Sequence, residues 1–181
     1  MLHLKNITAG NPKTAEQYQM TKRHSIVWLF SEDGKNWYEE QKNFSGNTIK
    51  VAYNEKGRVV WVGKDVTGIE PTNVSIIELP DITANRRITA PGYWFYRNDE
   101  FVFDYKLKAE DERDALLKQV SIMTSDWEKD LLLGLISDED REKLKAYRIY
   151  AKSLQAMDFS PITDKTSYNA IEWPVSPEAS S

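Results

Sequence analysis

The side chains best suited to catalysis or metal binding are few in this sequence. The chain contains no Cys and two His residues, His3 and His24, which lie far apart. Neither histidine has a neighbour at the spacing of a zinc site, and no thiolate nucleophile is available. The sequence therefore predicts no catalytic residue and no metal site.

Two acidic runs, at residues 110–112 and 138–140, are the remaining candidates for cation binding. Both lie where a first helical turn favours carboxylates, and neither has the alternating oxygen ligands and central Gly of a calcium loop. The sequence also lacks a Gly-x-Ser-x-Gly elbow, a phosphate-binding loop and a dinucleotide fingerprint. We therefore predict no cofactor, and a hydrolase using paired carboxylates has no support from their spacing.

The charge balance narrows the class of partner. Lys and Arg number 24 against 28 Asp and Glu, which gives a net charge of −4. A broad basic footprint for nucleic acid is missing, so DNA and RNA are not expected as partners. No apolar run approaches the roughly 20 residues of a bilayer span, so we expect a soluble chain with no membrane partner.

Trp and Tyr are unusually numerous, with 6 and 9 residues. Such rings dominate protein interfaces because each supplies a large, stiff surface with one polar group. Consecutive strand residues point to opposite faces, so the run at 93–96 cannot enter one small core entirely. We predict a binding protein rather than an enzyme, although these rings could also only close a thin core. The candidate partner-binding residues are Trp28, Phe30, Trp37, Tyr38, Trp61, Trp94 and Tyr96.

The first part of the chain has the composition of a β-rich domain. Residues 48–53 and 58–62 are β-branched runs around a turn that ends in Gly57, which predicts a hairpin. Further strands are expected at 24–30 and 74–79, and a second hairpin at 93–105. Residues 37–40 fit a strand or one helical turn, and the first twenty-odd residues are expected to form an extended arm.

After Leu107 the apolar period changes to three or four residues, which predicts a helix of about 25 residues. Gly134 ends or bends it, and Ser137 caps a second helix that must return antiparallel, forming an αα-hairpin. From Asp158 onward, three prolines indicate an extended tail. The residues expected to pack this region are Leu116, Val120, Trp127, Leu131, Leu144, Tyr147, Leu154 and Trp173.

These observations predict an α+β protein with two domains. Every Gly except Gly134 precedes the change of period. We place a β-rich domain at residues 1–107, and a helical domain at residues 108–181. The predicted architecture is a small β-rich amino-terminal domain followed by an antiparallel αα-hairpin and an extended carboxy-terminal tail.

Several motifs in both domains together carry a family resemblance. They are residues 11–19, 28–40 and 80–87, the helix start at 137–140, Tyr147 with Tyr150, and the ending Glu172-Trp173-Pro174. Their combination resembles the phage tail-fibre assembly proteins, the chaperones of receptor-binding fibres, and in particular those of Mu-like phages. Between Lys118 and Ile136 the chain departs from the family pattern. The usual Ala-rich helix with a Pro near its middle is replaced by the sequences at 122–127 and 131–133.

The resemblance implies a protein without enzymatic activity that acts in the cytoplasm of the infected or lysogenic host. It implies that the amino-terminal domain grips the carboxy-terminal tip of a trimeric tail-fibre protein while the helical domain supports assembly. Weak self-association through the helical domain and retention on the fibre tip in the virion stay open. The rival interpretation is a carbohydrate-binding module whose Trp28, Trp37 or Trp94 stacks on sugar rings of a bacterial surface.

Overall fold

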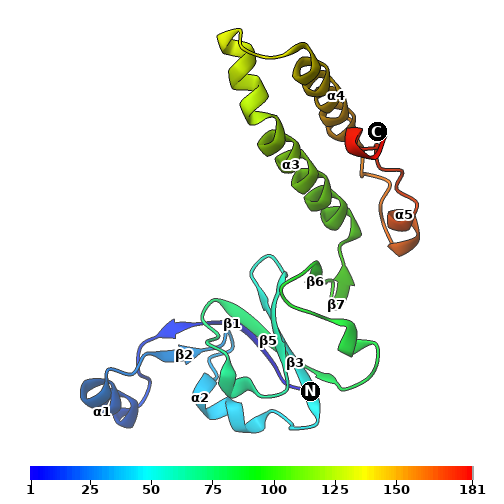
Figure 1. Ribbon diagram of the computed structural model, residues 1–181. Helices are drawn as coiled ribbons and strands as arrows, with labels where there is room; N and C mark the ends of the chain where they lie inside the picture. Colours follow the sequence, from blue (N-terminus) through cyan, green and yellow to red (C-terminus); the bar gives the residue numbers. More distant parts are fainter. Residues whose placement is uncertain (181) are drawn as a thin grey trace. The chain divides into compact units, whose positions relative to one another are not determined.

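A computed structural model describes residues 1–180 of the chain and divides it into two compact units, Met1–Phe103 and Asp104–Ser181. The first unit is built mainly of strands and the second of helices, so the predicted α+β class is confirmed (Figure 1). The domain boundary expected after residue 107 falls in the first turn of the long helix, which begins at Tyr105.

The first unit contains a five-stranded antiparallel sheet with the order β2-β1-β5-β3-β4 and a separate two-stranded sheet of β6 and β7. Its helical segments are short. The strands are β1 (His3–Gly10), β2 (Trp28–Phe30), β3 (Thr48–Asn54), β4 (Val59–Gly63), β5 (Val74–Pro80), β6 (Trp94–Arg97) and β7 (Glu100–Phe103). The helical segments are α1 (Ala15–His24), α2 (Trp37–Glu40), η1 (Gln41–Asn43), η2 (Val66–Gly68) and η3 (Asn85–Arg87).

The predicted extended arm at the amino terminus is wrong. Residues His3–Gly10 form β1, which pairs with both β2 and β5 near the middle of the sheet. Its Leu4 and Ile7 are fully buried in the core. Helix α1 follows, with the Thr14 side chain accepting a hydrogen bond from the Gln17 N–H as an N-cap. The strand expected at 24–30 is consequently reduced to the three residues of β2.

Both predicted hairpins are confirmed. Strands β3 and β4 pair across a turn in which Gly57 adopts a φ of +79°. A Cβ atom at this glycine would lie 2.4 Å from the Tyr96 carbonyl oxygen, so only glycine fits. The Tyr96 N–H in turn donates to the Gly57 carbonyl at 2.7 Å, which joins the β6–β7 hairpin to the β3–β4 turn.

The central sheet carries a hydrophobic cluster on each face. One cluster includes Leu4, Ile7 and Ile76, and the other includes Val51, Val59 and Ile88. Strand β3 contributes to both, because its residues alternate between the two faces. Burial on both faces explains why β3 reads as a nearly continuous apolar run.

The second unit is built on an antiparallel pair of helices, α3 (Tyr105–Leu133) and α4 (Asp138–Gln155), as Figure 1 shows. Gly134 ends α3 with a left-handed φ of +69°, and the Ser137 side chain caps α4, both as predicted. The tail is less extended than expected, because it contains α5 (Lys165–Asn169) and η4 (Pro177–Ser180). None of the helices within residues 1–180 is long and apolar enough to cross a membrane.

The core of the helical unit lies on the part of the hairpin away from its turn. Val120, Tyr147 and Leu154 are buried there, with Leu116, Trp127 and Trp173 packed against them. Leu144 is also buried. Trp173 reaches the core from the tail, where its ring lies 5.8 Å from that of Phe159.

The expectation that Leu131 packs between the helices is wrong, since 47% of its surface is exposed. The physical reason lies in α4, whose first six residues are all charged and whose first apolar residue is Leu144. Helix α4 therefore offers Leu131 no apolar neighbour near the turn. Leu132, Leu133 and Leu135 are exposed there as well.

Candidate protein-binding surfaces

Three of the seven candidate partner-binding residues are buried inside the first unit. Trp28, Phe30 and Trp37 each expose 7% of their surface or less. They therefore contribute to the folding of the unit and offer little surface to a partner. This corrects the sequence-based expectation for these three residues.

Trp28 is covered by helix α1, which the sequence analysis had not predicted. The Trp28 indole N–H lies 2.8 Å from the Thr21 hydroxyl oxygen and 3.2 Å from the Gln17 carbonyl oxygen. Trp37 belongs to the core cluster and contacts the ring of Phe44 edge-on. Both indoles are thus held by contacts within the chain.

Tyr38 is the most exposed of the candidates, with 45% of its surface accessible. It lies in α2, its hydroxyl donates to the Val27 carbonyl at 2.8 Å, and its ring meets that of Trp28 edge-on at 5.8 Å. The ring is therefore fixed in position while one side stays open to solvent. A pre-ordered aromatic side chain of this kind loses little entropy on binding.

Trp61, Trp94 and Tyr96 are half-buried. Trp61 packs against the core cluster that contains Leu4, while Trp94 packs against the cluster on the other face. Tyr96 stacks on Tyr53 with ring centroids 4.6 Å apart. Each of the three rings is therefore partly exposed, while its other side packs against residues of the same unit.

His3, Tyr53 and Tyr96 form an aromatic cluster that the sequence analysis missed. The His3 Nε2 lies 2.7 Å from the Tyr53 hydroxyl, and the His3 ring meets that of Tyr96 edge-on at 5.6 Å. Burial and the Asp99 carboxylate, which accepts from the Tyr96 hydroxyl at 3.0 Å, raise the pKa of Tyr96 to about 12. Burial, together with the charge of Lys5, lowers the pKa of His3. The three rings are therefore uncharged near neutral pH.

A buried polar network fixes the loops at one end of the sheet. Glu78 of β5 and Lys50 of β3 lie opposite one another, 5% and 1% exposed. The Glu78 carboxylate accepts from the Leu2 N–H at 3.2 Å, the Ser45 N–H at 2.6 Å and the Thr48 hydroxyl at 2.6 Å. These hydrogen bonds lower the pKa of Glu78 despite the opposing effect of its burial.

The Lys50 ammonium is held by backbone oxygens. It donates to the carbonyls of Ser45, Thr48 and Lys64. The pattern of β3 did not indicate this network. A Lys between two apolar residues, here Ile49 and Val51, is typical of a strand position that faces solvent. Among residues 1–180 there is no group of three or more His, Asp or Glu side chains that could hold a metal ion. The polar side chains of this network are hydrogen-bonded to the loops around residues 45–48 and 64 and hold them to the sheet.

Comparison with known proteins identifies the family. Residues 39–178, which run from α2 to η4, match the model of the Caudovirales tail fibre assembly protein, lambda gpK. The chain belongs to the tail fibre assembly protein family. The resemblance seen in the sequence is thereby confirmed.

Individual members of the family are similar over nearly the full chain. Tail fiber assembly protein U' of Escherichia phage Mu is 46% identical over 171 residues, covering 90% of this chain and 97% of that protein. Tail fiber assembly protein U of the same phage is 38% identical over 184 residues, covering 98% and 100%. The probable tail fiber assembly protein of Escherichia phage P2 is 40% identical over 164 residues, covering 87% and 94%. The similarity to family members therefore spans both units.

Proposed function

We propose that this protein is an assembly chaperone that binds the carboxy-terminal region of a phage tail fibre and promotes its folding and trimerisation. The observation that carries the proposal is the 46% identity to tail fiber assembly protein U' of phage Mu over 97% of that protein. The proposal includes no enzymatic activity. It places the protein in the host cytoplasm while fibres assemble.

The physical need for such a protein follows from the nature of long fibres. Three intertwined chains have many contacts between residues far apart in sequence, so they fold slowly and expose unpaired strand edges meanwhile. A protein that covers the exposed end of each fibre chain keeps that chain able to assemble until three chains align. Trimerisation itself supplies the free energy, so passive holding needs no nucleotide.

We assign the recognition of the fibre to residues 1–107 and the support of assembly to residues 108–181. Of the seven candidate aromatic residues, Tyr38, Trp61, Trp94 and Tyr96 keep surface available to a partner. Interfaces of standard size bury about 1,600 Å² in total and are commonly centred on Trp or Tyr. The burial of Trp28 and Trp37 removes two of the three rings on which a carbohydrate-binding role would depend.

The test is coexpression of this protein with its own tail-fibre protein. We expect soluble, protease-resistant trimers that withstand SDS, whereas the fibre alone aggregates. The variant Tyr38→Ala should lower copurification with the fibre, while Tyr18→Ala serves as a control because Tyr18 is 49% exposed in the same unit. Equal fibre folding without this protein would refute the proposal.

A chimera tests the division of roles. Residues 1–107 joined to the helical region of a family member that serves another fibre should bind the fibre of this protein. If the chimera instead binds the fibre of the family member that supplied its helical region, the assignment of roles is wrong. A glycan array, on which we expect no binding, tests the carbohydrate-binding alternative.

A further inference from the structure

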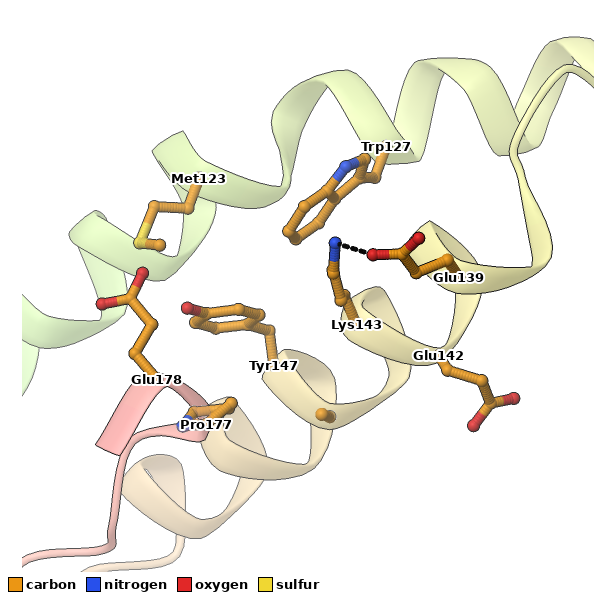
Figure 2. A pocket seen from close by; sticks show the side chains of 9 residues that line it. Met123, Trp127, Glu139, Glu142, Lys143, Tyr147, Pro177 and Glu178 are labelled. Atoms are coloured by element: carbon orange, nitrogen blue, oxygen red, sulfur yellow. Dashed lines mark hydrogen bonds and ion pairs between the residues drawn. The ribbon is translucent and has the colours of Figure 1, made fainter. Parts of the chain in front are cut away.

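A groove with a cavity volume of about 750 Å³ lies along the helical unit (Figure 2). Met123 and Trp127 of α3 form one side, Lys143 and Tyr147 of α4 form the other, and Glu178 of η4 closes one end. Its volume lies within the roughly 300–1,000 Å³ typical of ligand-binding cavities. All of these residues belong to one compact unit.

The floor of the groove is aromatic and firmly supported. The rings of Trp127 and Tyr147 lie 6.0 Å apart at an angle of 40°. Tyr147 is buried against Val120 and Leu154, so its ring cannot move aside. Met123, by contrast, is 42% exposed, and its unbranched thioether adapts to the shape of a neighbour. This combination suits one large apolar side chain.

The rim of the groove carries an excess of negative charge. It has three carboxylates, Glu139, Glu142 and Glu178, and one ammonium, that of Lys143. The Lys143 Nζ pairs with Glu139 at 2.6 Å, so its charge is already matched within the chain. The Glu178 carboxylate lies beside the Tyr147 hydroxyl (Figure 2). Burial is the main cause that raises the pKa of Tyr147, and the hydrogen bond with Glu178 adds to it. Tyr147 thus stays neutral near pH 7, and its hydroxyl lies beside the Glu178 carboxylate at the end of the groove.

We propose that this groove docks a segment of a partner protein in which a basic residue adjoins a large apolar side chain. The apolar side chain lies against Met123, Trp127 and Tyr147, and the basic group pairs with Glu178. Arginine suits the site better than lysine, because a guanidinium binds a carboxylate with two hydrogen bonds and stacks on aromatic rings. The acidic rim repels phosphates, which argues against nucleic acid and anionic lipid.

This surface is separate from the fibre grip assigned to residues 1–107, so the two proposals stand or fall independently. The direct probe is a pair of capped peptides, Ser-Leu-Arg-Leu-Ser and Ser-Leu-Glu-Leu-Ser, titrated into the full chain. The readout is the NMR signal of the Trp127 indole N–H, assigned by its loss in Trp127→Phe. We expect the Arg peptide to shift this signal in a saturable manner and the Glu peptide to leave it unchanged.

Two matched variants test whether the Arg side chain of the peptide pairs with Glu178. Glu178→Gln should weaken binding of the Arg peptide about tenfold, which corresponds to about 1.4 kcal/mol. Glu172→Gln removes an exposed carboxylate from the same tail outside the groove and should leave the affinity unchanged. Thermal melts of both variants should match that of the parent protein.

Any one of the following results would overturn the proposal. The first is no shift of the Trp127 signal with the Arg peptide up to roughly 1 mM, the weak limit of useful affinity. The second is an equal response to both peptides or an equal loss in both Gln variants. The third is a signal that changes with protein concentration and not with peptide, because a second copy of the chain would then occupy the groove.

Discussion

Replacing Glu78 by Gln tests how much the buried polar network stabilises the first unit. Glu78 accepts three hydrogen bonds, at 2.6, 2.6 and 3.2 Å, as a carboxylate. The amide of Gln accepts only through its oxygen, and its NH₂ group must face one of the present donors. Hydrogen bonds to charged groups contribute about 1.5–3 kcal/mol each. Losing one and weakening a second, with Lys50 left without the nearby negative charge, should cost about 3 kcal/mol.

This loss is a large share of the free energy of unfolding of a typical domain, which is roughly 5–15 kcal/mol. Urea unfolding of the full chain at pH 7, followed by circular dichroism, measures it. Glu55→Gln is the matched control, because Glu55 is exposed in the β3–β4 turn. We expect the control to change the free energy of unfolding by less than about 0.5 kcal/mol.

The pH dependence gives an independent check of the same network. The pKa of Glu78 is lowered in the folded state, so its charge stabilises the fold fully above the pKa of the unfolded chain. This stabilisation is lost as the pH falls through the folded-state pKa. The difference between the parent protein and Glu78→Gln should therefore shrink on acidification below the ordinary glutamate pKa. A difference below about 1 kcal/mol at pH 7, or one that does not vary with pH, would refute the reasoning.

Four further substitutions test the fold. Leu131→Asp should leave the melting temperature unchanged because Leu131 is exposed, whereas Leu144→Ala should cost about 2–5 kcal/mol in urea unfolding as a core truncation. Gly57→Ala should lower the melting temperature, because a Cβ atom would collide with the Tyr96 carbonyl oxygen, and an unchanged melt would contradict the turn geometry. Trp173→Ala should reduce the stability of the helical unit, and a loss confined to the β-rich unit in hydrogen exchange would argue against its packing on the helices.

The sequence predicted those elements whose ends are marked by local chemistry. The β3–β4 hairpin was visible because Gly57 permits a left-handed turn between two β-branched runs. The αα-hairpin was visible because Gly134 and Ser137 mark the end of one helix and the start of the next. In these places the local signal and the tertiary structure agree.

Strand β1 was missed because an irregularity in its pairing hides the alternation of a strand. Its register shifts between Leu4 and Ile7, where Asn6 adopts a positive φ. The two core residues are therefore three positions apart instead of two or four. Helix α1 did carry a signal that could have been used, namely Thr14 followed three residues later by Gln17, which is the spacing of a capping box.

The candidate binding residues were harder to predict than the helices and strands, because their exposure depends on tertiary structure. Trp28 looked available for binding only because the helix that covers it was not expected. Leu131 fits the helical period of α3, but burial depends on the opposite helix, whose first turns are charged. The groove is likewise built from three segments, α3, α4 and η4, which no pattern along the chain connects.

The place of β1 in the sheet has a consequence during synthesis on the ribosome. Hydrogen bonds join β1 to β5 across 69 positions of the chain, as between Asn6 and Ser75. At about 5–20 residues per second, β1 waits roughly 4 to 14 s before β5 is made. Helices α3 and α4, although synthesised last, need only local contacts and close within microseconds to milliseconds. A nascent chain arrested before Val74 should therefore be an easy target for proteases, and one arrested after Pro80 should resist them.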